Sequence, residues 1–205
     1  MRILMMTTAA LGMVMAAQTA SAQDTVSSNG TSFRGIRLEA NAGGDRFRSQ
    51  GESNDKFGYG GTIGFDGTIN NKIVIGPEAS FWRANNWNEN CSTPNGGGTV
   101  CHKSFEEWGV GVRAGVLLSP NFLVFGKGGY VVNEQRKRFD APAGQVGFRD
   151  RFATTGYQYG GGVEYTLSGP DAKLPVFVGA QYVYSQYNDR TSRQRVMGTI
   201  GIRFK

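Results

Sequence analysis

Residues 108–118 read WGVGVRAGVLL, and two kinds of side chain alternate along this stretch. Apolar residues occupy one set of positions: Trp108, Val110, Val112, Ala114 and Val116. Glycines occupy most of the other set, with Arg113 among them. Alternation with a period of two is typical of a β-strand whose two faces meet different surroundings. The stretch therefore predicts one extended strand, and it raises the question of which face meets water.

The same alternation recurs in seven other segments, at residues 36–42, 57–65, 73–81, 122–130, 157–165, 176–184 and 196–204. Short connectors rich in Asp, Asn, Gly, Pro and Ser separate some of them, at 66–71, 119–121 and 168–173. Long connectors span 45–56, 82–103 and 133–151, with a shorter last one at 188–193. Tight turns at one rim and long loops at the other are typical of an up-and-down barrel with an even number of strands. We therefore expect an all-β fold, an eight-stranded antiparallel up-and-down barrel over residues 33–205.

The composition of the two faces indicates which one is outward. The chain contains 31 glycines, and a face made mostly of glycine with sparse charge is a poor coat for a soluble protein. In the narrow lumen of an eight-stranded barrel, by contrast, there is room for only a few long side chains. Aromatic residues gather near the ends of the apolar faces, as they do at the two water–lipid interfaces of membrane barrels. These are Phe57, Phe65, Phe81, Trp108, Phe122, Tyr130, Tyr157, Tyr165, Tyr182, Tyr184 and Phe204. We therefore expect a transmembrane β-barrel with lipid outside, short periplasmic turns and long extracellular loops.

Charged residues on the glycine face should then point into the lumen. An arginine at mid-bilayer on the lipid side costs roughly 2–4 kcal/mol, so Arg113 should face inward, where it needs a partner. Counting from the turn rim places two acids and two bases at a similar height: Glu39, Glu78, Arg113 and Lys127. A second layer nearer the turns consists of Arg37, Glu164 and Arg203. We expect these charges to plug the lumen as a static polar core; a gate whose ion pairs exchange is the alternative.

The N-terminus has the anatomy of a secretory signal. It reads MRILMMTTAALGMVMAAQTASAQD, with a basic Arg2, an apolar stretch and a small-residue site at residues 20–22. We expect residues 1–22 to be a signal peptide and residues 23–32 to be a short N-terminal periplasmic segment. No later segment approaches the ~20 consecutive apolar residues of a spanning helix.

Cys91 and Cys101 bracket a glycine-rich part of the second long connector. Two cysteines in an exported chain favour a disulfide. Metal binding is the alternative, but two thiols and the adjacent His102 fall short of a closed zinc set. We therefore expect a disulfide, no metal and no cofactor.

Residues 108–133, WGVGVRAGVLLSPNFLVFGKGGYVVN, resemble the small outer-membrane β-barrel proteins of the opacity-protein and outer-membrane-protein-A-like group. In that group an aromatic-led strand with a central arginine, a short turn and a strand ending in K-G-G-Y recur in this order. Residues 73–82, IVIGPEASFW with the inward Glu78, look like the third strand of the family. The resemblance implies a barrel in the bacterial outer membrane that acts in envelope integrity, host contact or slight permeability. It also implies contact with the barrel-insertion machinery through the last strand, RVMGTIGIRF, although this chain ends Phe204-Lys205 rather than on the aromatic residue.

The connectors are rich in cations, and the formal net charge of the chain is +6. The third long connector carries the densest group: Arg136, Lys137, Arg138, Arg149 and Arg151. Cations near an anionic surface contribute about 1 kcal/mol each, so we expect contact with lipopolysaccharide or with a host or cell-surface ligand. Ordinary solvated loop charge is the alternative. The modest excess of cations does not by itself indicate nucleic acid.

One catalytic hypothesis rests on His102 and Ser104, because some outer-membrane barrels modify lipid A with a His–Ser pair. His102 is the only histidine, but it stands beside the loop cysteine, outside the context that those enzymes show. We therefore expect a monomeric, non-enzymatic barrel with a structural and surface-interaction role. A narrow gated channel is the alternative, followed by a lipid A-modifying enzyme.

Overall fold

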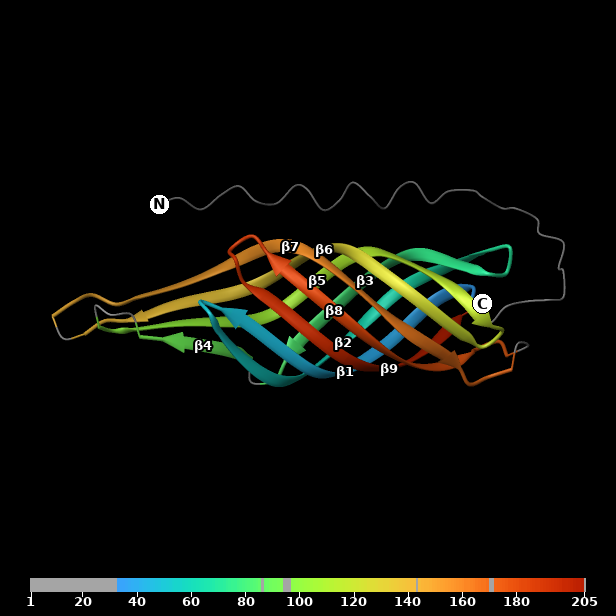
Figure 1. Ribbon diagram of the computed structural model, residues 1–205, viewed down its shortest axis with the longest axis horizontal. Helices are drawn as coiled ribbons and strands as arrows, with labels where there is room; N and C mark the ends of the chain where they lie inside the picture. Colours follow the sequence, from blue (N-terminus) through green and yellow to red (C-terminus); the bar gives the residue numbers. More distant parts are fainter. Residues whose placement is uncertain (1–32, 86, 94–96, 143, 170–171, 205) are drawn as a thin grey trace.

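The structure is a computed structural model that describes residues 33–85, 87–93, 97–142, 144–169 and 172–204. The expected signal peptide and the segment 23–32 lie outside the described residues. Nine strands are present in the described ranges (Figure 1). They are β1 (Gly35–Ser49), β2 (Glu52–Ile69), β3 (Ile73–Ala84), β4 (Asn88–Ser92), β5 (Thr99–Ser119), β6 (Phe122–Asp140), β7 (Phe148–Thr166), β8 (Val176–Tyr187) and β9 (Ser192–Phe204).

Eight of these strands close into a ring, which confirms the predicted barrel. The order is β3-β2-β1-β9-β8-β7-β6-β5, and pairing of β3 with β5 completes the circle. Every neighbouring pair is antiparallel. Closure leaves no open sheet edge in the ring, as a hydrocarbon environment demands. Within the described residues, no helix is long and apolar enough to cross a membrane.

The strands are longer than the alternation predicted. The connector expected at 45–56 is a hairpin in which Ser49 pairs with Glu52 around a two-residue turn, Gln50 and Gly51. Both turn residues have positive φ, 54° and 84°, as a tight hairpin turn requires. Most of the connector expected at 133–151 is also paired, up to Phe139 opposite Phe148. The predicted strand ends were wrong there because polar side chains cover both faces, which removes the apolar–polar contrast.

β5, β6 and β7 extend beyond the ring at the end of the barrel opposite the short connectors. Together with β4, these extensions lie at the left of Figure 1. The small strand β4 was not predicted, and it pairs with β5 so that Asn88 lies opposite Ser104. We call β4 with residues 99–107, 131–140 and 148–155 the protruding sheet. At the opposite end of the barrel the connectors are short, and β9 ends there (Figure 1).

The two faces of the ring differ as the sequence predicted. Large apolar side chains are exposed on the outer face, including Ile63, Trp108, Val110, Val112, Tyr130, Tyr157, Tyr165, Ile200 and Phe204. The inner face buries charged side chains, and Arg113 is 1% exposed. The outward, apolar face of the opening stretch is therefore the one that would meet lipid.

Glycines on the inner face leave space for long side chains. A Cβ at Gly58 would overlap the ring of Trp82, and one at Gly64 would lie 2.7 Å from Nη2 of Arg37. At Gly201 it would overlap the ring of Phe177. Three positions on two strands, β2 and β9, thus lack a side chain where a side chain from another strand fills the lumen.

Candidate functional site

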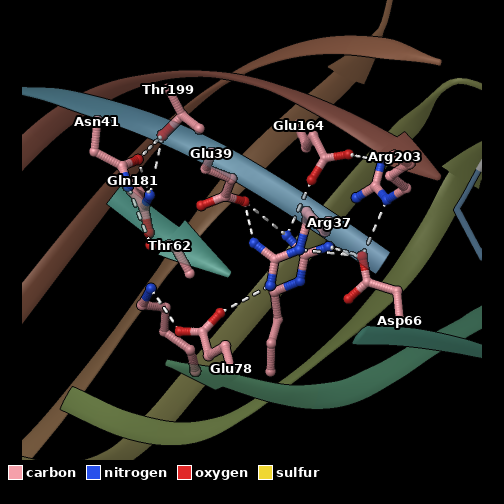
Figure 2. A network of polar contacts seen from close by, with 12 residues as sticks. Arg37, Glu39, Asn41, Thr62, Asp66, Glu78, Glu164, Gln181, Thr199 and Arg203 are labelled. Carbon is pink, nitrogen blue, oxygen red and sulfur yellow. Dashed lines mark hydrogen bonds and ion pairs between the residues drawn. The ribbon is translucent and has the colours of Figure 1, made fainter. Parts of the chain in front are cut away.

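The lumen near the short turns holds one ionic network (Figure 2). Its members are Arg37, Glu39, Asp66, Glu78, Arg113, Lys127, Glu164 and Arg203. We call it the lumen network. It contains four carboxylates and four cations, so its formal charges cancel. It includes all seven lumen charges that the sequence indicated, but as one network rather than as two layers.

Asp66 is the hub of the lumen network. Its Oδ2 lies 2.7 Å from Arg113, 3.0 Å from Arg203 and 3.2 Å from Arg37. The residue is fully buried. Asp66 was missed in the sequence because it begins residues 66–71, whose composition indicates a turn. Its position next to the outward-facing Phe65, which places it on the inner face of the strand, was a usable signal.

The remaining contacts link the hub to the other walls. Arg37 contacts Glu39 and lies 2.9 Å from Glu78, which also lies 2.7 Å from Lys127. Glu164 lies 3.0 Å from Arg113 and 2.5 Å from Arg203. The network therefore joins β1, β2, β3, β5, β6, β7 and β9. Removing one member of a buried ion pair costs about 3–5 kcal/mol because the other charge is left uncompensated.

A layer of uncharged polar groups lies next to the lumen network (Figure 2). Asn41 donates to Thr62 over 3.1 Å, and Gln181 donates to Asn41 over 2.9 Å. The Thr199 hydroxyl donates to Asn41 over 2.7 Å. These bonds tie β1 to its neighbours β2 and β9, and to β8 beside β9, along the inner face of the wall.

A second ionic group lies toward the protruding sheet. Asp45 lies 2.9 Å from Arg193 and accepts a 2.6 Å hydrogen bond from the indole of Trp82. Glu107 lies 2.7 Å from Arg195 and accepts a hydrogen bond from the Tyr187 hydroxyl. We call these residues the upper network. Sequence reasoning missed them because they lie in, or at the border of, predicted connectors. Continued alternation was the available signal, since Asp45 follows Glu39 and Asn41 on the same face of β1.

The five basic residues of the third connector do not form one patch. Strand register places Arg136 opposite Arg151 and Arg138 opposite Arg149, on the outer face of the protruding sheet. Lys137 lies on the other face, opposite Asp150. Like charges directly opposed across strands are destabilising. The outer face of this sheet therefore carries two unfavourable like-charged pairs.

Carboxylates offset part of this charge. Glu89 lies 3.2 Å from Arg136, Glu134 lies 2.6 Å from Arg151 and Asp140 lies 3.0 Å from Arg138. Arg149 has no ion-pair partner within the described part of the chain. Cys91 and Cys101 face each other on β4 and β5 and form a disulfide.

The structure gives His102 and Ser104 separate partners. The Ser104 hydroxyl donates to Asn133 over 3.0 Å. His102 is buried beside the Phe47 and Phe152 rings, with its Nε2 3.7 Å from Asp189. Burial lowers the pKa of His102 below its usual value, against the opposing effect of Asp189. Among the described residues, no group of three or more His, Cys, Asp or Glu side chains is arranged to hold a metal ion.

Comparisons with known proteins agree with this architecture. A model of the family described as outer membrane protein beta-barrel domain matches residues 6–204. Among solved structures, Ail, the attachment invasion locus protein of Yersinia pestis, in complex with the heparin analogue sucrose octasulfate, superimposes with a TM-score of 0.54. The match has 16% sequence identity and covers 83% of this chain and 99% of Ail. A second crystal structure of Ail gives a TM-score of 0.53 with the same identity and coverage. No curated protein sequence matches the chain significantly.

Proposed function

Because the chain belongs to the outer membrane protein beta-barrel domain family and lies in the bacterial outer membrane, we propose that it acts there without catalysis, as a closed anchor for its protruding sheet. The ring would fix the sheet outside the cell, and the outer face of the sheet would contact acidic saccharides of the envelope or of a host surface. Both parts of this proposal rest on the distribution of charge.

The opposed arginines of the protruding sheet carry the proposal. Arg136 with Arg151, and Arg138 with Arg149, form two like-charged cross-strand pairs on one face. The repulsion within such pairs is destabilising, and a bound anion would offset it. Sulfate, phosphate and carboxylate groups accept paired hydrogen bonds from guanidinium groups. An acidic saccharide therefore fits this face better than a neutral one.

One of the two Ail structures is a complex with a sulfated saccharide, the heparin analogue sucrose octasulfate. That ligand belongs to Ail, and at 16% identity the likeness shows the fold alone. It nevertheless supports the choice of sulfated saccharides as the first probes for this chain.

The channel alternative requires the lumen to open. Ion pairs fill it in two places, and the side chains of Arg37, Arg113, Arg193 and Arg203 are at most 1% exposed. An ion that crossed the barrel would have to break contacts in both networks. We therefore propose a static plug rather than a gate formed by Glu39, Glu78, Arg113 and Lys127.

The lipid A-modifying alternative needs a serine activated by histidine. Ser104 instead donates to Asn133. We propose that expression of the protein leaves the acyl chains of lipid A unchanged. Changed acyl chains that revert in a His102→Ala variant would establish the enzyme instead.

Binding to an immobilised sulfated glycan tests the proposed function. The folded protein in detergent should bind, with affinity that falls as salt rises, and the Arg138→Glu/Arg149→Glu variant should bind at least about tenfold more weakly. Lys72→Glu/Lys173→Glu is the matched control, because it changes net charge equally at the opposite end of the barrel. If both variants lost binding equally, binding would depend only on the net charge of the protein, which would contradict the proposal.

A further inference from the structure

Four cations surround two aromatic rings on the outer face at the base of the protruding sheet. The guanidinium of Arg83 and the ammonium of Lys103 each lie 5.3 Å from the ring centre of Trp87. Trp87 packs edge-to-face on Phe105, with ring centres 5.1 Å apart. Arg151 lies 4.7 Å and Arg136 5.8 Å from the Phe105 ring. We call these six residues the exterior arc.

The exterior arc holds like charges side by side. Lys103 on β5 lies opposite Arg136 on β6, which lies opposite Arg151 on β7. Two carboxylates contact this row: Glu89 lies 4.0 Å from Lys103 and 3.2 Å from Arg136, and Glu134 lies 2.6 Å from Arg151. Arg83 has no carboxylate partner within the described part of the chain. Positive charge therefore remains in excess around the Trp87 ring, between Arg83 and Lys103.

The arc lies directly above the apolar, lipid-facing surface of the ring. Arg83 is opposite Tyr59 and two residues from Phe81 on the same face of β3. The exposed Trp108 pairs with Phe81 across the β3–β5 seam. A groove of about 450 Å³ runs between the two regions. Phe81, Trp108 and Val132 form its apolar part, and Glu106, Glu134 and Arg151 form its polar part.

We propose that the exterior arc binds the phosphorylated saccharide headgroup of an outer-leaflet glycolipid, with an acyl chain along Phe81, Trp108 and Val132. Aromatic residues of membrane barrels lie at the water–lipid interface, so the arc reaches the level of the headgroup phosphates. The apolar groove is what selects a lipid-linked anion, because a dissolved saccharide gains nothing from it. This inference rests on the proposed contact with acidic saccharides and names one membrane-bound partner for it.

The test counts lipid A molecules bound to the folded protein by native mass spectrometry from detergent. Bisphosphorylated lipid A should bind the unaltered protein, and dephosphorylated lipid A should bind at least about tenfold more weakly. The Arg83→Ala/Lys103→Ala variant should lose about 30-fold in affinity for the bisphosphorylated form, since each cation contributes about 1 kcal/mol. Lys72→Ala/Lys173→Ala is the control, because it removes the same charge at the opposite end of the barrel; its affinity should change by less than about threefold. Heat-modifiable mobility verifies that each variant is folded.

Two results would overturn the inference: equal binding of dephosphorylated lipid A, or equal losses in the arc variant and its control. Sucrose octasulfate is the soluble probe for the same proteins. If the arc variant loses the soluble anion but retains lipid A, the site is for dissolved anions and the glycolipid assignment is wrong. If lipid A binds through the arc but no sulfated glycan binds the sheet, the glycolipid site stands and the wider saccharide role fails.

Discussion

Asp66 on β2 accepts a 2.7 Å hydrogen bond from Arg113 on β5, across the inner face of the intervening strand β3. The same carboxylate oxygen contacts Arg37 on β1 and Arg203 on β9. One buried acid thus links strands on both sides of the pairing between β1 and β9, the first and last strands of the chain. Loss of that single charge leaves three buried guanidinium groups with fewer partners.

Replacing the hub should destabilise the barrel strongly. We expect Asp66→Asn to lower the free energy of unfolding by about 3–5 kcal/mol, because it leaves buried cations uncompensated. Urea unfolding in lipid vesicles measures this change. Asp55→Asn is the control: Asp55 pairs with Arg46 on the exposed part of the first hairpin, where the expected loss is below about 1 kcal/mol. Similar losses in the two variants would mean that the network adds little to stability.

Because the lumen is closed, we expect the protein to conduct no ions. In planar bilayers we expect no discrete channel openings from the unaltered protein. Arg113→Ala should lower the melting temperature without producing a defined conductance, because Arg37, Lys127 and Arg203 still occupy the lumen. Reproducible openings that increase in Arg113→Ala would favour the gated channel instead.

Glycine at position 58 should be required for packing in the lumen. A methyl group there would overlap the Trp82 ring. We expect Gly58→Ala to cost about 1–3 kcal/mol in unfolding free energy through overpacking. Gly44→Ala is the matched control, since a Cβ at Gly44 has no atom within 4 Å. The idea of a space-filled lumen fails if Gly58→Ala is as stable as Gly44→Ala.

The buried histidine should make stability depend on pH. Its folded pKa is lowered from 6.5 by burial, so the unfolded chain binds the proton more readily. The contribution of His102 to stability is therefore complete above about pH 6.5 and is lost as the pH falls through the lower folded pKa. Unfolding of the protein should become easier between about pH 7.5 and 5.5, and His102→Gln should weaken that dependence. Since the chain has one histidine, identical pH profiles would rule this contribution out.

The disulfide should stabilise the protruding sheet rather than the ring. Cys91 and Cys101 join β4 to the upper part of β5. We expect Cys91→Ser/Cys101→Ser to reduce local stability by about 2–3 kcal/mol, seen as faster protease cleavage between residues 85 and 99. The heat-modifiable mobility of the ring should not change. Unaltered cleavage would show that strand pairing alone holds β4.

The sequence predicted the membrane-spanning part of the fold well because lipid and lumen demand opposite side chains. Arg113 could be placed inward from its neighbours and from the cost of a charge in lipid. Above the membrane both faces meet water or polar side chains, so the period-two contrast disappears. Residues 133–140 and 148–151 therefore looked like a loop, although they are paired strands.

The site was only partly predictable for related reasons. Glu78 and Lys127 lie inside segments that were predicted as strands, whereas Asp66 and Asp45 stand beside Gly, Asn and Ser residues that indicate turns. The facing of Arg136 and Lys137 depends on strand register, which a charge-rich segment does not reveal. Strand β4 could not be predicted either, since its side-chain contacts to β1 and β2 come from distant sequence. Asn88 bonds Asp45 on β1, and Asn90 bonds Ser49 on β1 and the backbone oxygen of Glu52 on β2.

Quenching of tryptophan fluorescence by brominated lipid tests the orientation of the two faces most directly. One variant retains Trp108 alone, 63% exposed on the outer face, and another retains Trp82 alone, 2% exposed in the lumen. In vesicles, brominated acyl chains should quench Trp108 strongly and Trp82 weakly. Stronger quenching of Trp82 than of Trp108, or release of the folded protein into buffer without detergent, would contradict the account.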